Sequence, residues 1–550
     1  MKKNRLGILV SVILLIILLL ILLFRLFPQK TDKPKLVVGI VVDQMAYDFI
    51  DRYWSKYSDN GFKRLIKKGF FCKNANFIHF PTYTAPGHTC IYTGTVPKLN
   101  GIVGNDWYDR SLGRARYCAD DSTVNTVGSF SNEGKMSPSS MLVNSITDQL
   151  KMSNNNKSKV IGIALKDRGG IFPAGKKGNA SYWYDASAKY WITSTYYMKN
   201  LPAWVDEFNK KGLPDQYLSK PWNTLLPIEQ YTESIADDNK FEDTYNGEEK
   251  PVFPHNFPEL KHRNIQLLRY SPFGNSITKD FAISAIKGEQ LGKGEETDFL
   301  CVSFSSTDYV GHMYGPNSVE VEDTYLRIDR DISELLDFIN DNTGFDNTLI
   351  FLTSDHGVCS NPEYLKSQNI DAGTFFPRII TDSVNMYIEK KYGKSNLASY
   401  FINQQLYLNH KLVKESGIDI KDLSKDVAAF IHRSIPGVMN TFNSYDIMSG
   451  IDADEFTNLF RNGYLESRSG DVFVNFRKYW IETRIRGAEH GSPYEYDTHV
   501  PLIWFGWNIP KGETSERINM TDIAPTIAAL LKIAPPEECI GKPIRALTAY

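Results

Sequence analysis

Four apolar runs, each followed by charged residues, are the feature of this sequence that most restricts its fold. They read "KLVVGIVVDQM", "KVIGIALKDR", "DFLCVSFSSTD" and "TLIFLTSDHG". Such continuous runs are typical of strands that are buried on both faces, as in a parallel sheet. Helical patterns such as "VEVEDTYLRIDRDISELLDFIND" lie between them. The alternation predicts an α/β fold with a doubly wound, mostly parallel central sheet and helices on both faces.

The polar residues after these runs are the candidate site residues. Because ligands of doubly wound sheets bind beyond the carboxyl ends of the strands, we expect these side chains to converge. Asp308 and His312 form an Asp-x-x-x-His pair in which a strand end and the following turn can face one ion, and His490 lies in a Gly-flanked loop. With the other strand-end residues, three carboxylates and three imidazoles suit a borderline cation and predict a two-metal site. The strand-end residues are Asp43, Lys166, Arg168, Asp308, Asp355 and His356.

The segment "PTYTAPGHT" offers a nucleophile. Thr84 precedes Ala-Pro-Gly, which fits the start of a helix because proline is tolerated in the first turn. A helix N-terminus favours an alkoxide or a phosphate, but a threonine hydroxyl reacts only when a metal or a base removes its proton. The alternative is that Thr84 only caps the helix.

The first residues predict export. Three basic residues lie within the first five, and 18 uncharged residues follow from Gly7 to Phe24. This pattern favours a transmembrane anchor at residues 1–28 with the rest of the chain outside the cytoplasm, and a cleaved export signal is the alternative. The expected location is therefore periplasmic or at the cell surface.

Composition adds little about partners. The formal net charge of -2 does not indicate a nucleic-acid partner. The sequence does not give the oligomeric state, for which a monomer is the expectation. Six cysteines are available for pairing in an oxidising compartment, but the sequence does not decide their pairing.

Two stretches of the predicted catalytic domain, residues 35–550, have the character of insertions. Residues 170–275 are rich in aromatic residues ("SYWYDASAKYWITSTYYM"), and we expect them to pack a cap against the core. Residues 360–480 separate His356 from His490.

The ordered motifs resemble those of the alkaline phosphatase superfamily, most closely the PafA-type bacterial alkaline phosphatases, from Lys35 to the C-terminus. The resemblance rests on "GIVVDQM", "FPTYTAPGHTCIYTG", "NGIVGNDWY", "ALKDRGG", "SSTDYVGH", "TSDHG" and "GAEHGSPYEYDTHVPL". It implies an exported phosphomonoesterase with two Zn²⁺ ions per chain and a phosphothreonine intermediate on Thr84. It also implies that Asn105, Lys166 and Arg168 bind the phosphoryl oxygens. The implied ligands are Asp308, His312 and His490 for one zinc, and Asp43, Asp355, His356 and the Thr84 oxygen for the other.

Lys166 and Arg168 also bear on the substrate class. A monoester presents more unshielded negative charge in the transition state than a diester does, so two cations favour monoesters. The related nucleotide pyrophosphatase/phosphodiesterases, which resemble the chain in their metal ligands, are the alternative enzyme. An inactive relative that binds metal or phosphate is the non-enzyme alternative.

Overall fold

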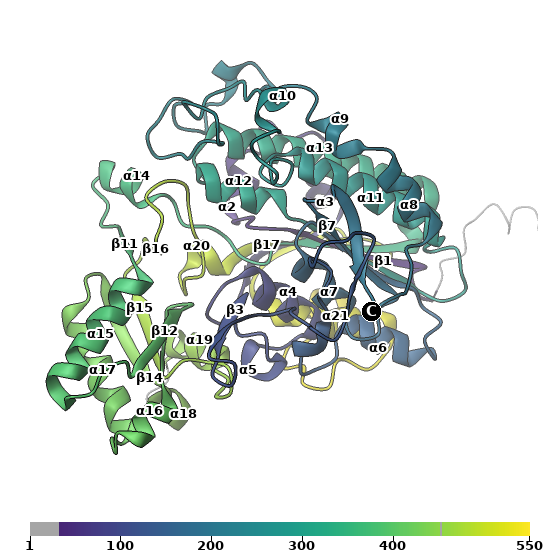
Figure 1. Ribbon diagram of the computed structural model, residues 1–550. Helices are drawn as coiled ribbons and strands as arrows, with labels where there is room; N and C mark the ends of the chain where they lie inside the picture. The colour runs from purple at the N-terminus through teal and green to yellow at the C-terminus, as the bar shows by residue number, and fades with distance from the viewer. Residues whose placement is uncertain (1–31, 451–453, 550) are drawn as a thin grey trace, which may run out of the picture.

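The computed structural model describes residues 32–450 and 454–549, and its centre is a ten-stranded sheet (Figure 1). The four predicted strands are β1 (Leu36–Val42), β6 (Val160–Ala164), β9 (Asp298–Phe304) and β10 (Thr348–Thr353). They pair in parallel in the order β10-β1-β9-β6. The predicted fold class is therefore confirmed.

The two margins of the sheet contain its antiparallel pairs. On one side, β17 (His499–Gly506) runs antiparallel to β10 and to β2 (Phe70–Asn76), and β18 (Gly512–Asn519) is the edge strand. On the other side, β7 (Ala180–Asp185) continues the parallel part, and β8 (Tyr190–Ser194) and β5 (Thr126–Val127) follow with antiparallel pairing.

Helices cover both faces, because side chains of a strand alternate between the two faces. In β1, Leu36, Val38 and Ile40 join one buried cluster, which includes residues of α11 (Phe273–Glu289) and α13 (Val319–Asn342). Val37 and Val41 join a second cluster with residues of α4 (Thr84–Thr93) and α21 (Ile523–Leu531). Figure 1 shows these helix pairs on opposite sides of the sheet.

The expectation of an aromatic cap within residues 170–275 is wrong for its first part. The segment "SYWYD" is β7, and "YWITS" is β8 of the central sheet. Tyr182 and Tyr184 enter the core cluster with α11, whereas Trp183 between them enters a different cluster. This alternation with a period of two, together with the strand preference of aromatic residues, explains the strands.

Residues 360–480 include a smaller lobe with its own sheet. Its strand order is β12-β13-β15-β14, from β12 (Ala398–Ile402), β13 (Gln405–Leu408), β14 (Val438–Asn443) and β15 (Val472–Phe476). Helices α15 (Pro377–Tyr392) and α17 (Ile420–Ser434) share an apolar core with it. The lobe lies at the lower left of Figure 1, beside the hairpin strand β3 (Asp106–Asp109).

The predicted membrane anchor stays a prediction. The predicted anchor, residues 1–28, lies outside the described residues, and none of the helices described elsewhere is long and apolar enough to span a membrane. All six cysteines are described, and each is a free thiol.

Candidate metal and phosphoryl site

The candidate nucleophile begins the helix α4. Thr84 is its first residue and is 1% exposed. The N-cap is Tyr83, and no side chain caps the helix, so the alternative in which Thr84 is the cap is wrong. Asn105 fixes this turn, because its Oδ1 accepts a hydrogen bond from the backbone N–H of Ala85 at 2.9 Å. The Thr84 hydroxyl therefore remains available for chemistry at a helix N-terminus.

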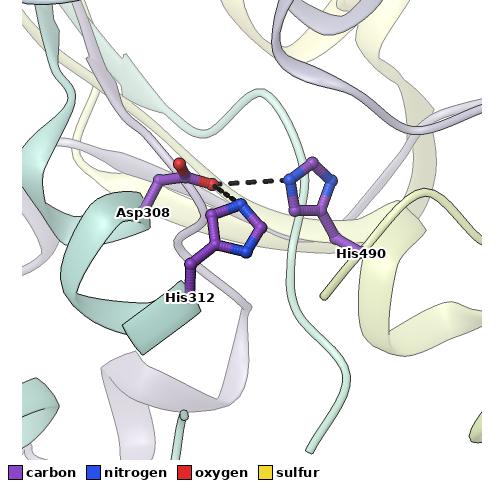
Figure 2. Close-up of side chains that lie close together, drawn as sticks. All are labelled: Asp308, His312 and His490. Carbon is purple, nitrogen blue, oxygen red and sulfur yellow. Dashed lines mark ion pairs between the residues drawn. The ribbon is translucent and has the colours of Figure 1, made fainter. Parts of the chain in front are cut away.

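One group of metal-binding donors consists of Asp308, His312 and His490, shown in Figure 2. Asp308 and His312 lie one turn apart on α12 (Ser306–Tyr314) and not at a strand end, because β9 ends at Phe304. An i, i+4 spacing places both side chains on one face of a helix. The Nε2 atoms of His312 and His490 lie 3.2 and 3.4 Å from Asp308 Oδ1.

A second group consists of Asp43, Asp308 and His356, whose ligand atoms lie within 4.8 Å of one another. Asp43 directly follows β1, and His356 comes three residues after β10. Asp355 was expected here but belongs to neither group, although its Oδ2 lies 3.6 Å from His356 Nε2. The two groups share Asp308, so five of the predicted metal ligands gather at one edge of the sheet.

Backbone carbonyls orient the three imidazoles. Nδ1 lies 2.8 Å from Ala488 O in His312, 3.0 Å from Gly357 O in His356 and 2.9 Å from Thr82 O in His490. A carbonyl only accepts, so each Nδ1 carries a proton that it donates. Each Nε2 is thereby turned toward a carboxylate, which is the arrangement of metal-ligating histidines.

These residues fit divalent cations. An Nε2 lone pair that faces a carboxylate oxygen at 3.2–3.4 Å is repelled unless a proton or a cation lies between them. Burial lowers the pKa of His356 to about 3, so its imidazole is neutral, and its Nε2 has no hydrogen-bond partner among the described residues. Burial and the neighbouring Asp355 raise the pKa of Asp43, so its ionised form requires a nearby cation.

Lys166 and Arg168 approach the same edge from the start of α7 (Asp167–Ala174), because β6 already ends at Ala164. Lys166 Nζ lies 2.7 Å from Asp43 Oδ2, 2.5 Å from Asp308 Oδ2 and 3.4 Å from Thr84 Oγ1. Burial lowers the pKa of Lys166, but these carboxylates outweigh it and raise the pKa above its ordinary value. Both cations line a cavity of about 220 Å³ together with Tyr309.

Two contributors received no role in the site from the sequence. Gln44, directly after Asp43, donates from Nε2 to Asp308 Oδ1 at 2.8 Å, and its backbone N–H donates to Asp355 Oδ1 at 3.2 Å. His88 is fully buried, and its Nδ1 lies 2.9 Å from Thr84 O and 3.2 Å from Asp355 Oδ2. The only feature of the sequence that indicated a place for His88 near the site was its position one turn after Thr84.

Known proteins are similar to this chain in sequence and in fold. A family model described as type I phosphodiesterase / nucleotide pyrophosphatase matches residues 37–479. A protein of Myroides odoratus, described as a calcium-transporting ATPase, is 44% identical over 524 residues, which are 94% of this chain and 95% of the relative. Alkaline phosphatase PhoV of Synechococcus elongatus is 42% identical over 521 residues, 95% of this chain and 94% of PhoV.

A solved structure agrees with these sequence matches. The crystal structure of alkaline phosphatase PafA superposes with a TM-score of 0.91 at 40% identity, covering 94% of this chain and 99% of PafA. Fold and site thus define a metal-dependent phosphatase of the alkaline phosphatase superfamily. The chain belongs to the type I phosphodiesterase / nucleotide pyrophosphatase family and, within it, groups with the alkaline phosphatases PafA and PhoV.

Proposed function

We propose that the protein hydrolyses phosphate monoesters through a phosphothreonine on Thr84, at a site that holds two Zn²⁺ ions. The observation that carries the proposal is the convergence of the Thr84 hydroxyl, the Lys166 ammonium and six Asp and His donors at one edge of the sheet. Its activity is that of an alkaline phosphatase, in agreement with PhoV and PafA.

The metals would be held by residues of both donor groups. Asp308, His312 and His490 would bind one ion, and Asp43, Asp355, His356 and the Thr84 oxygen would bind the other. Zinc accepts both carboxylates and imidazoles, which is the composition of both sets. When bound, the two ions lower the proton affinity of the nucleophile and offset negative charge on the reacting oxygens.

The residues of the chain perform the remaining tasks. Thr84 Oγ1 forms the bond to phosphorus as the bond to the alcohol breaks, and water later hydrolyses the phosphothreonine to release phosphate. The α4 N-terminus favours the anionic oxygen, and Asn105, which already holds Ala85, lies beside that turn. Lys166 and Arg168 offset the charge on the transferred phosphoryl group.

The two cations support monoesters as the substrate class. A monoester carries one more negative charge on its non-bridging oxygens than a diester does, and a buried ammonium within 3.4 Å of the nucleophile stabilises that charge. The family model is named after phosphodiesterases, but the relatives PhoV and PafA, at 42% and 41% identity, are alkaline phosphatases and favour the monoesterase.

The test compares an aryl phosphate monoester with the matching diester in the purified, metal-loaded protein. We expect a large preference for the monoester, and Lys166→Ala should reduce kcat/KM for the monoester by about 10²–10³-fold with little effect on the diester. Thr84→Ala should abolish the acid-stable phosphoprotein that forms in single-turnover experiments. A diester preference that survives Lys166→Ala would favour the phosphodiesterase instead.

A further inference from the structure

The Tyr117 side chain holds Arg168, and neither the sequence motifs nor the relatives give Tyr117 a role. Its Nη1 donates a hydrogen bond to the Tyr117 hydroxyl at 3.1 Å, and its guanidinium carbon lies 5.9 Å from the centre of the Tyr117 ring. The same hydroxyl donates to Asp167 Oδ1 at 2.6 Å. Tyr117, Asp167 and Arg168 therefore form one continuous chain of hydrogen bonds.

The direction of this chain follows from the chemistry of a phenol. A hydroxyl has one proton to donate and two lone pairs that accept. The Asp167 carboxylate takes the proton, so a lone pair of the Tyr117 oxygen is left to face Arg168. Asp167 thus decides the orientation of the hydroxyl, and the hydroxyl decides where Arg168 Nη1 lies.

The position of Tyr117 in the chain also connects it with Asn105, which lies beside the first turn of the Thr84 helix. It ends β4 (Arg114–Tyr117), which pairs with β3, and Asp106 at the start of β3 is paired with Tyr117. Asn105 precedes β3, and its carbonyl accepts a hydrogen bond from the N–H of Cys118 at 2.9 Å. One short hairpin therefore connects Asn105, which holds the first turn of the Thr84 helix, with the side chain that holds Arg168.

We propose that Tyr117 is a positioning residue, which, oriented by Asp167, holds the Arg168 guanidinium in register with the phosphoryl group bound beside Thr84 and Asn105. This inference rests on the proposed role of Arg168. A long arginine side chain loses rotamer freedom when it is fixed, and a partner that fixes it before substrate binds removes that cost from the transition state.

The experiment is a double-mutant cycle on the metal-loaded enzyme, with Tyr117→Phe, Arg168→Ala and the double variant. A hydrogen bond to a charged group predicts that Tyr117→Phe lowers kcat/KM for the aryl monoester about tenfold. It should weaken inhibition by inorganic phosphate in parallel and leave the diester rate unchanged. In the Arg168→Ala background, the same change should have no further effect, because the residue acts through the arginine.

Two further variants test the rest of the chain of hydrogen bonds. Asp167→Asn keeps an oxygen that accepts from the hydroxyl and should retain more activity than Asp167→Ala. Tyr57→Phe is the control, since the Tyr57 hydroxyl likewise donates a hydrogen bond, to Phe49 O at 2.9 Å, and Tyr57 lies far from these residues in the sequence. It should leave all three kinetic readouts unchanged.

The possible outcomes separate this inference from the proposed function. If Arg168→Ala does not impair the monoester reaction, the role of Arg168 is wrong, and Tyr117 loses its proposed task with it. If Arg168→Ala does impair it, but Tyr117→Phe is harmless or is equally harmful in both backgrounds, Tyr117 is not a positioning residue for Arg168.

Discussion

His255 illustrates how a single buried residue ties the stability of this protein to pH. Its Nδ1 lies 2.9 Å from Glu248 Oε1 and its Nε2 lies 3.3 Å from Glu320 Oε1. Burial lowers the pKa of His255, but the two carboxylates outweigh it and raise the pKa to about 9. The rings of Trp222 and Tyr245 pack around the imidazole and keep water from it.

The direction in which pH changes the stability follows from the linkage between protonation of His255 and folding. Because the folded pKa of His255 lies above its ordinary value of 6.5, its contribution to stability is complete below about pH 6.5 and is lost as the pH rises through 9. A pKa that rises from 6.5 to about 9 corresponds to at most about 3.4 kcal/mol, at 1.36 kcal/mol per pKa unit. We expect His255→Gln to destabilise the protein strongly at pH 6.5 and much less at pH 9.5.

Urea unfolding of both proteins at several pH values measures this difference. The exposed His432→Gln is the control and should change the free energy of unfolding by less than about 0.5 kcal/mol at every pH. A gap between the wild type and His255→Gln that stays constant from pH 6.5 to 9.5 would show that His255 is not protonated in the folded protein.

At the scale of elements, the packing of α4 on the end of β10 determines the geometry around Thr84. A Cβ atom at Gly87 would lie only 2.2 Å from the backbone oxygen of Asp355. Replacing glycine by alanine inside a helix ordinarily stabilises by up to about 1 kcal/mol. Here the sign should reverse, because the helix must move away from β10 to admit the methyl group.

We therefore expect Gly87→Ala to destabilise by about 1–3 kcal/mol and to reduce monoester turnover more than tenfold, since Thr84 and Asp355 separate. Gly294→Ala is the matched control, because a Cβ there meets no atom within 4 Å. Thermal unfolding and steady-state kinetics of the two variants provide the comparison. Equal behaviour of the two variants would mean that α4 accommodates the methyl group without a shift.

The elements also explain what the sequence could and could not predict. The central strands were predictable, because runs such as residues 36–42 are apolar without interruption. The aromatic strands β7 and β8 were assigned to a cap, because their alternation lies in a stretch that contains no long apolar run.

Parts of the site were predictable where two residues are close along one element, or where a residue directly follows a strand. Asp43 at a strand end and the Asp308–His312 spacing are such cases, even though that pair lies on a helix. The contribution of Gln44 was not predictable, because its contact with Asp308 depends on two segments that are 264 residues apart. The metal-binding roles of all these residues, Asp355 included, stay predictions.

At the scale of the whole molecule, the donor cluster joins elements from both ends of the chain. Asp43 follows β1, His356 follows β10, Asp308 lies on α12, and His490 comes from a loop before β17. Asp43, Asp308 and Asp355 are each at most 2% exposed, and Lys166 pairs with the first two of them. Without metal, these buried carboxylates repel one another with one ammonium between them.

Removal of the metal should therefore lower the stability of the entire catalytic domain and not only its activity. A ligand that binds the folded state alone stabilises by about 4 kcal/mol at 1,000 times its Kd. For a chain of this size, we expect chelation to lower the Tm by roughly 5 °C or more, and re-addition of Zn²⁺ to restore it. Differential scanning calorimetry with and without chelator measures the shift, and elemental analysis counts the ions that leave.

Lys166→Ala and Asp43→Asn distinguish stabilisation by the bound metal from stabilisation by the ion pairs of Lys166. Lys166→Ala removes the internal cation, so the apo form should be destabilised further and the shift upon Zn²⁺ addition should grow. Asp43→Asn removes a ligand charge, so the apo form should gain stability relative to the wild type while the shift shrinks. An unchanged Tm upon chelation, with the ions shown to be gone, would mean that Lys166 and the histidines alone neutralise the buried carboxylates.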